Sequence, residues 1–295
     1  MIDPTLSEWL NLIARWIHVF AGIMWVGTTY YFTWLDARLT EVEKAVANTG
    51  SAAQIWMVHS GGFYVVEKRK IPDELSRKLH WFRWEAGTTW ISGMALLLLL
   101  FYVGGGSGLV DPDVRDSFIE CLRGFGADSL SAFLAAHYEG LAIVLGIFLI
   151  FLAGFIYDMM MLSPLGRNEK AFAVIAYLIL VGIAFGLTRV LSARAAYIHI
   201  GAMMGTIMAA NVWMHILPAQ KKMIAAIKEG RKPDDALSAK AKLRSKQNTF
   251  MAVPVVFIML SSHFPGVTYG ERNNWLILAI LILAGWIAAK FIRRA

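Results

Sequence analysis

Several long stretches of this sequence contain almost no charged residue. Runs of about 18 or more apolar residues are typical of helices that cross a lipid bilayer. The composition agrees, because 57% of the 295 residues are hydrophobic and 17% are charged, whereas a soluble domain carries about 25% charged residues. The sequence therefore predicts an all-α, polytopic transmembrane helix bundle.

The apolar stretches divide a single membrane domain, residues 1–295, into about seven membrane spans. The sixth span is the weakest, because its apolar run is short and contains Pro254. Residues 36–85 and 218–249 are too long to be simple turns, and we assign both segments to the cytoplasm. The predicted spans are residues 6–35, 86–103, 132–161, 172–190, 195–217, 250–262 and 275–291.

The positive charges predict the orientation of these spans. Cytoplasmic loops of membrane proteins are enriched in Lys and Arg, and an N-terminus outside the cell places most of the 28 Lys and Arg residues in the cytoplasm. The net charge of +7 then reflects cytoplasmic loops that face anionic lipid, and not a nucleic-acid surface. The basic residues that remain on the outer side are Arg15, Arg115, Arg123, Arg189, Arg194 and Arg272.

The single cysteine, Cys121, limits the redox chemistry of the chain. It cannot form a disulfide within the chain, and the sequence has no CxxC or CxxCH motif. Iron–sulfur clusters and covalently attached c-type haem are therefore excluded in this sequence. A metal would have to be held by His, Met or carboxylate side chains.

Four histidines, with His263 among them, lie in the outer half or near the centre of predicted spans, and the three candidate ligands on three different helices are His18, His137 and His199. A polar ring at such a depth is costly unless a partner satisfies it. Small residues neighbour each one, as Gly22 does for His18 and Gly140 for His137, which would leave room for a flat macrocycle. The pattern favours a b-type haem between helices. The alternative is that each ring only bonds a carbonyl or hydroxyl of another helix.

A second group of polar residues falls at the cytoplasmic ends of the spans. A helix that enters the second span from about residue 72 would place His80, Arg83 and Trp84 on one face. Arg offers fixed donors to a planar anion, and Trp offers a stacking plane. The alternative is an interfacial belt of aromatic residues and snorkelling cations. The other members of the group are His59, Trp81, Glu85, Asn211 and His215.

Four stretches together resemble one known family: WIHVFAGIMWVGTTYYF, HSGGFYVVEKRK, LHWFRWEAGTTWISG and ARAAYIHIGAMMGTIMAANVWMHILPAQK. They are similar to the membrane domain of the bacterial membrane-bound urate oxidases, which are cytochrome-c-coupled urate hydroxylases. The resemblance covers nearly the whole chain. It implies oxidation of urate to 5-hydroxyisourate in purine breakdown, in the bacterial inner membrane, with electrons passed to a cytochrome c.

Members of that family typically end with one more span and a cytochrome c domain outside the membrane. This sequence ends at FIRRA without a CxxCH motif, so we expect no cytochrome c domain here and a separate or fused cytochrome as the acceptor. An N-terminus outside the membrane agrees with the family layout. A homo-oligomer is also possible for such a bundle.

The resulting hypothesis assigns three roles. Urate binds through Arg83, Trp84, Trp81, Asn211 and His215. Protons are taken up by His59, His80 or Glu85, since imidazoles and carboxylates suit this task. Electrons pass to a haem b held by some of His18, His137 and His199. The alternatives are a haem-binding membrane oxidase of another substrate, and a purine or metal transporter lined by His and Met side chains.

Overall fold

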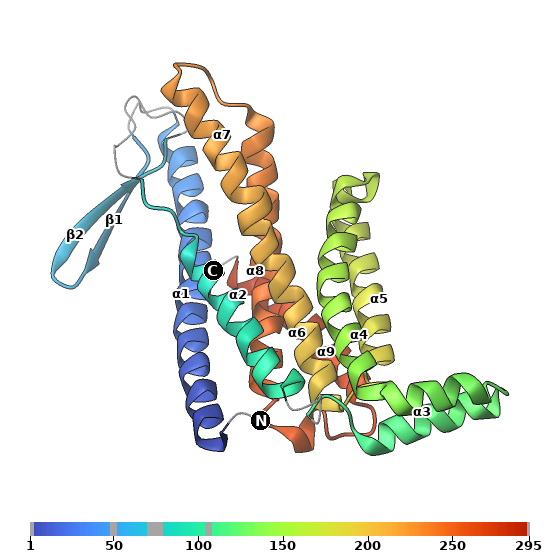
Figure 1. Cartoon of the computed structure of the whole chain (residues 1–295). Coiled ribbons are helices and arrows are strands. Elements are labelled where there is room, and N and C mark those ends of the chain that lie inside the picture. Colours follow the sequence, from blue (N-terminus) through green and yellow to red (C-terminus); the bar gives the residue numbers. More distant parts are fainter. Residues whose placement is uncertain (1–2, 48–51, 70–78, 104–107, 294–295) are drawn as a thin grey trace.

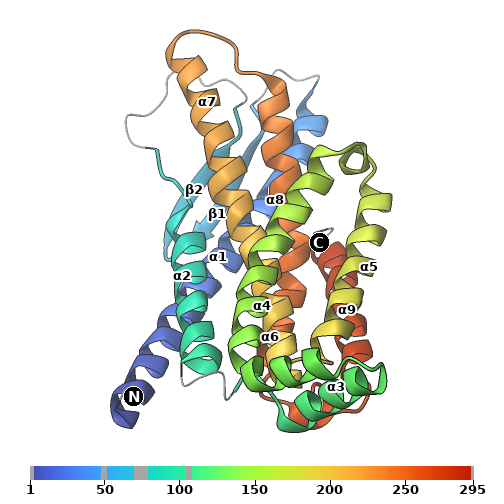
Figure 2. The ribbon, with the colours of Figure 1, turned by 45° about the vertical axis from the view of Figure 1, so that its right-hand side comes forward.

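The computed structural model describes residues 3–47, 52–69, 79–103 and 108–293. Within them, long helices run side by side, and one shorter helix lies across an end of the bundle (Figures 1 and 2). The elements are α1 (Pro4–Val46), β1 (Gln54–His59), β2 (Gly62–Glu67), α2 (Trp84–Leu97), η1 (Leu98–Tyr102), α3 (Pro112–Gly124), α4 (Asp128–Leu162), η2 (Pro164–Arg167), α5 (Glu169–Leu187), α6 (Ala193–Ala210), η3 (Asn211–Ile216), α7 (Leu217–Lys228), α8 (Asp235–Ser261), η4 (Pro265–Val267) and α9 (Asn274–Ile292).

The all-α fold class is confirmed. Among the described residues, 6 helices are long and apolar enough to cross a membrane, which is compatible with a multi-pass membrane protein. Each predicted span except the sixth falls on one of these helices. They are Pro4–Val46, Trp84–Tyr102, Asp128–Leu162, Glu169–Leu187, Ala193–Lys228 and Asn274–Ile292.

The sixth predicted span lies at the end of α8, which is too polar in its first half to be counted among the membrane-crossing candidates. Even so, α8 follows the central helix α6 over a long distance. Its residue Ile258 packs against Gly201 of α6, and the chain beyond α8 returns to the start of α6, where the Tyr197 hydroxyl donates to the Asn274 carbonyl (2.6 Å). A seventh crossing therefore stays a prediction that the packing of α8 supports.

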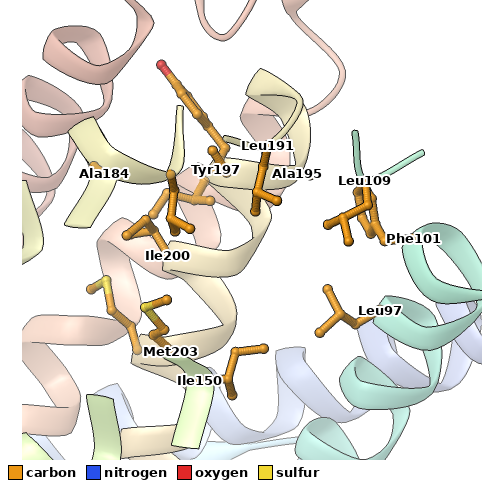
Figure 3. Packing of buried hydrophobic residues seen from close by; sticks show 14 of the residues in the cluster. Leu97, Phe101, Leu109, Ile150, Ala184, Leu191, Ala195, Tyr197, Ile200 and Met203 are labelled. Carbon is orange, nitrogen blue, oxygen red and sulfur yellow. The ribbon is translucent and has the colours of Figure 1, made fainter. Parts of the chain in front are cut away.

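The centre of the bundle is the continuous helical run formed by α6, η3 and α7. In its most apolar window 61% of the residues are buried, against 6% for α1 and 17% for both α4 and α5. The outer helices therefore expose apolar side chains, which is favourable only where lipid replaces water. Figure 3 shows the central packing, in which Ile200 and Met203 of α6 lie near Leu97, Phe101 and Ile150 of the neighbouring helices.

Helices α8 and α9 approach each other closely at a glycine. A Cβ atom added to Gly285 of α9 would lie 2.9 Å from the backbone nitrogen of Pro254 in α8. Small residues at such crossings allow two backbones to pack directly in a membrane bundle. Pro254 is also tolerated inside a helix more easily there, because neighbouring helices satisfy the freed backbone groups.

The β1–β2 hairpin is an element that the sequence prediction missed. The two strands pair antiparallel from Gln54↔Glu67 to His59↔Gly62, and the turn uses positive φ angles at Ser60 (50°) and Gly61 (78°). Ser60 and Gly61 therefore form the two-residue turn, and Gly62 already belongs to β2. The hairpin extends from the end of the bundle that carries the α7–α8 connection, and α3 crosses the opposite end (Figure 1).

We predict that Gly285→Ala destabilises the protein. The added methyl group meets backbone atoms of Pro254, which cannot rotate away, and such overpacking costs about 1–3 kcal/mol. Thermal unfolding of the detergent-purified protein measures the effect. Gly182→Ala in α5 is the matched control, because nothing lies within 4 Å of its added Cβ. Equal stability of the two variants would contradict the described packing of α8 on α9.

Candidate functional site

A charged pair lies inside the bundle where α4, η3 and α8 meet. Arg244 of α8 has only 2% of its surface exposed. Its guanidinium donates to Asp158 Oδ1 of α4 (2.5 Å) and to Asn211 Oδ1 of η3 (2.9 Å), and it lies over the Tyr157 ring, 5.3 Å from the centroid. An unpaired buried charge is strongly unfavourable, so these contacts fix the guanidinium and join the three elements.

Amide and phenol side chains extend this pair into a hydrogen-bonded network. Asn211 donates to Asn248 Oδ1 (2.9 Å) and to the Tyr157 hydroxyl oxygen (3.2 Å). Asn248 donates to the Met208 carbonyl (3.0 Å), and the Tyr157 hydroxyl donates to Gln247. Buried polar networks whose members are satisfied are rigid and specify one arrangement of the helices around them.

His215 is bound to the more open side of this network. Its Nε2 lies 2.9 Å from Asp158 Oδ1, the same oxygen that binds Arg244. The His215 side chain is 14% exposed and that of Asp158 31%, whereas Asn211 is fully buried. A carboxylate that holds one ring nitrogen leaves the other available for proton transfer. We call Tyr157, Asp158, Asn211, His215, Arg244, Gln247 and Asn248 the polar cluster.

The local winding of the central helix places Asn211 and His215 in the polar cluster. Residues Asn211–Ile216 form a π-helical segment, η3, between α6 and α7. Such segments insert one extra residue into a turn and are frequent at functional sites. Asn211 and His215 meet α4 and α8, while Val212 and Ile216 pack with Ala86 at the start of α2.

The α2 side of η3 carries the aromatic residues predicted from the sequence. Trp84 and Trp213 meet edge to face, with 5.7 Å between ring centroids. Gly87 allows this approach, because an added Cβ would lie 3.0 Å from the Trp213 ring. The Arg83 guanidinium lies 5.8 Å from the centroid of Trp84, and one carboxylate oxygen of Glu85 is buried without a hydrogen-bond partner in the described part of the chain.

The prediction that His80, Arg83 and Trp84 share a helix face is wrong. The helix begins only at Trp84, with Arg83 as its N-cap, and His80 lies in the preceding non-helical segment. His80 is exposed and packs edge to face on Phe82. The start of the predicted helix, near residue 72, lies outside the described residues.

His59 also lies away from the polar cluster. It is exposed at the end of β1, where its Nδ1 lies 2.9 Å from the Ser60 hydroxyl. The predicted site residues are therefore distributed in three ways. Asn211 and His215 belong to the polar cluster. Residues 81 and 83–85 lie near the other side of η3, and His59 and His80 are exposed.

Sequence reasoning missed the charged centre of the cluster, Arg244, and its neighbours Gln247 and Asn248. Arg244 was counted only among the basic residues of a surface segment. A usable signal was present, because Arg244 and Asn248 are four residues apart and share a helix face that runs directly into an apolar span. Asp158 is likewise a charged residue near the end of an apolar span, residues 132–161.

The three histidines predicted to hold haem are not brought into one site. The ring of His18 packs on α2, with Nδ1 2.9 Å from the Thr89 carbonyl. An added Cβ at Gly93 would lie 2.8 Å from this ring. A carbonyl partner at one ring nitrogen is the usual support of a metal-binding histidine, so His18 alone would suit a ligand role through its other nitrogen.

His199 and His137 do not fit the same haem. Both ring nitrogens of His199 are engaged, Nδ1 with the Ala195 carbonyl (2.7 Å) and Nε2 with the Tyr102 hydroxyl (2.7 Å). An added Cβ at Gly146 would lie 2.6 Å from that Nε2, so the space beside the ring is filled. His137 is exposed on α4. In the described part of the chain, no group of three or more His, Cys, Asp and Glu residues could hold a metal ion.

We predict that Arg244→Met strongly destabilises the bundle. Breaking a buried ion pair by removing one partner costs about 3–5 kcal/mol, and the partly exposed Asp158 places the expected loss near the lower end. The double variant with Asp158→Asn recovers part of it, because no carboxylate is left unpaired. Thermal unfolding in detergent is the measurement.

Lys246→Met is the control, since its pair with Glu169 is exposed and such pairs contribute about 0–1 kcal/mol. An Arg244→Met variant no less stable than this control would show that the buried pair does not hold the helices together.

Comparison with known protein families places this geometry in context. The family described as urate oxidase N-terminal matches residues 4–295, which is nearly the whole chain. No curated protein and no solved structure matches the chain significantly. The match includes every element of the polar cluster and all of the candidate membrane helices. The chain therefore belongs to the urate oxidase N-terminal family.

Proposed function

We propose that the protein oxidises urate to 5-hydroxyisourate and passes the electrons to a cytochrome c. The family match supports a urate-related oxidoreductase, and the candidate membrane helices support a membrane location. The observation that carries the proposal is the polar cluster, which combines a buried cation with a carboxylate–imidazole pair. The proposal sets the protein in a bacterial inner membrane, and the orientation that the positive-inside rule predicts puts the cluster toward the cytoplasmic side.

The reaction sets three requirements for the site. Urate and water yield 5-hydroxyisourate, two protons and two electrons, so two molecules of a one-electron acceptor such as ferric cytochrome c are reduced. The site must attract an anion, since urate is mostly a monoanion near neutral pH. It must also accept protons from the substrate or water, and it must leave a route for the electrons.

In this proposal the polar cluster serves the second requirement through His215 and the first only in part, because Asp158 balances much of the Arg244 charge. Arg244 supplies a positive charge that cannot be lost by deprotonation, and Asp158 and Asn211 hold it in a fixed position. His215 is the proton acceptor in this proposal. Asp158 orients its ring through Nε2 and stabilises the imidazolium that forms. Urate is placed beside Asp158 and His215, because these two residues are partly exposed whereas Arg244, to which Asp158 is bound, is buried.

The aromatic residues on the α2 side have a secondary part in the proposal. Trp84 and Trp213 offer flat apolar surfaces close to η3, and a purine ring stacks well on such surfaces. Arg83, Trp81 and Glu85 stay predictions for substrate binding or proton transfer. The exposed residues His59 and His80 also stay predictions, because their described contacts are with Ser60 and Phe82 and not with the polar cluster.

A haem b bound by His18, His137 and His199 stays a prediction, and the contacts of these residues do not fit it as one site. No step of the proposed reaction therefore passes through such a group. An absorption spectrum of the purified protein tests the prediction. A Soret band that disappears in His18→Ala would show that a haem binds through His18.

The proposed reaction predicts that the purified protein reduces added ferric cytochrome c when urate is supplied without oxygen. Two cytochromes are reduced per urate consumed, because the oxidation releases two electrons. Absorbance of reduced cytochrome and loss of urate are recorded together. Urate uptake into proteoliposomes without any cytochrome reduction would instead favour the transporter alternative.

We predict that His215→Ala lowers the turnover number for urate by about 10²–10⁴-fold, the usual contribution of a general base. Added imidazole restores part of the rate, because the mutation leaves space beside Asp158. The control is His263→Ala, since His263 is exposed after the opposite end of α8. Unchanged turnover in His215→Ala, with the protein still folded by thermal unfolding, would remove His215 from the mechanism.

A further inference from the structure

One face of the β1–β2 hairpin is apolar and exposed. The strand register places Trp56 opposite Val65 and Val58 opposite Phe63, and alternate residues of a strand point to the same face. These four side chains therefore form one continuous patch, which we call the hairpin face. Their exposed fractions are 68% for Trp56, 69% for Val58, 79% for Phe63 and 44% for Val65. A patch of this kind marks an interaction surface.

Two contacts fix the height of the hairpin along α1. Lys68, which follows β2, pairs with Asp36 of α1, and the Tyr31 hydroxyl contacts Met57 Sδ at 3.4 Å. Tyr31 comes five residues before Asp36, which corresponds to about 7.5 Å along the helix axis. Asp36 is the first Asp, Glu, Lys or Arg after Arg15, so the middle of the hairpin lies on the apolar side of this charge.

The hairpin face continues a surface that already faces lipid if α1 crosses the membrane. Phe32 and Trp34 of α1 are 44% and 39% exposed near the contact with the hairpin. In Figure 1 the strands slant away from α1, and their turn points back toward the N-terminal end of that helix. The hairpin thus extends sideways at the level of the membrane boundary, and not away from the bundle into solvent.

The two-stranded form of the hairpin limits how deep it can lie. The outer edges of β1 and β2 pair with no further strand in the described part of the chain, and unpaired backbone groups are not tolerated in hydrocarbon. Interfacial elements bury their apolar face about 5–10 Å into the boundary between headgroups and acyl chains. The axial offset between Asp36 and Tyr31 falls within this range.

The charges at the base of the hairpin favour an anionic leaflet. Asp36 binds both Lys68 and Lys242, and Arg69 binds Glu67, so cations outnumber carboxylates in these pairs of the described residues. The same end of the bundle carries the basic helices α7 and α8, including Lys221, Lys222, Lys228, Lys240 and Lys246. Basic residues next to a membrane are attracted to anionic phospholipids.

We propose that the β1–β2 hairpin is a membrane-docking element whose hairpin face inserts into the interfacial region of an anionic phospholipid leaflet. It would anchor the segment between α1 and α2, and it does not depend on the reaction that the polar cluster catalyses. Trp56 suits the interfacial region because its ring is apolar and its N–H is polar.

Spin labelling tests the proposal. A nitroxide is attached to Val58→Cys in a Cys121→Ser background, which removes the exposed native thiol, and the protein is placed in nanodiscs of equal parts phosphatidylcholine and phosphatidylglycerol. Accessibility to oxygen, which partitions into lipid, is compared with accessibility to a water-soluble nickel chelate. Phe20→Cys on exposed α1 gives the lipid reference, and Glu229→Cys gives the aqueous reference.

The expected ratio of oxygen to nickel accessibility for Val58 lies well above that of Glu229 and toward that of Phe20. Phe63→Cys on the paired strand gives the same result, which guards against a local effect of one label. A ratio equal to that of Glu229 would place the hairpin in water and overturn the proposal. Low accessibility to both reagents, with dipolar broadening between labels, would overturn it in favour of a second copy of the chain.

Discussion

The buried ion pair between Arg244 and Asp158 constrains the whole bundle. An arginine that is 2% exposed must have oxygen partners within reach, and those partners come from α4 and η3. The pair therefore determines how α4, α8 and the central helix are positioned relative to one another. Helix α8 is the least apolar of the long helices, because its first half is mostly polar and exposed and because Arg244 and Asn248 add polar residues to its buried face.

The polar contacts of η3 lie on one side of this segment and its apolar contacts on the other. This separation follows from the position of the Arg244–Asp158 pair. On one side of η3, hydrogen bonds hold the buried Asn211 in the polar cluster, and on the other side the Trp84 and Trp213 rings pack edge to face. The half of the bundle away from the polar cluster shows a different pattern, since the two ring nitrogens of His199 are engaged by Tyr102 and by a carbonyl of its own helix. A buried histidine can thus be fully satisfied by its surroundings, and depth in a membrane helix is by itself weak evidence for a metal ligand.

Much of the fold could be predicted from the sequence, because apolar runs of membrane length leave few alternatives to a helix. The start of α2 at Trp84 and the β1–β2 hairpin could not be predicted in that way, since both depend on short segments with mixed character. Asn211 and His215 were found because two polar residues stand out in an apolar helix. Arg244 was overlooked because a basic residue in a basic segment looks like a surface charge until the packing of α8 shows it buried.

The π-helical segment η3 has a consequence for how this chain tolerates changes in length. The run from α6 to α7 contains one residue more than a regular α-helix would need at η3. Deleting a residue from the regular turns of α6 would rotate everything that follows, η3 and α7 included, by about 100° about the common axis. The Lys side chains of α7 would then point elsewhere, and His215 would leave Asp158. Deleting a residue within η3 would instead let the wide turn close to a regular one, so α7 would nearly keep its phase. The extra residue of η3 therefore gives this helix one place that can absorb a change of length, which its regular turns cannot.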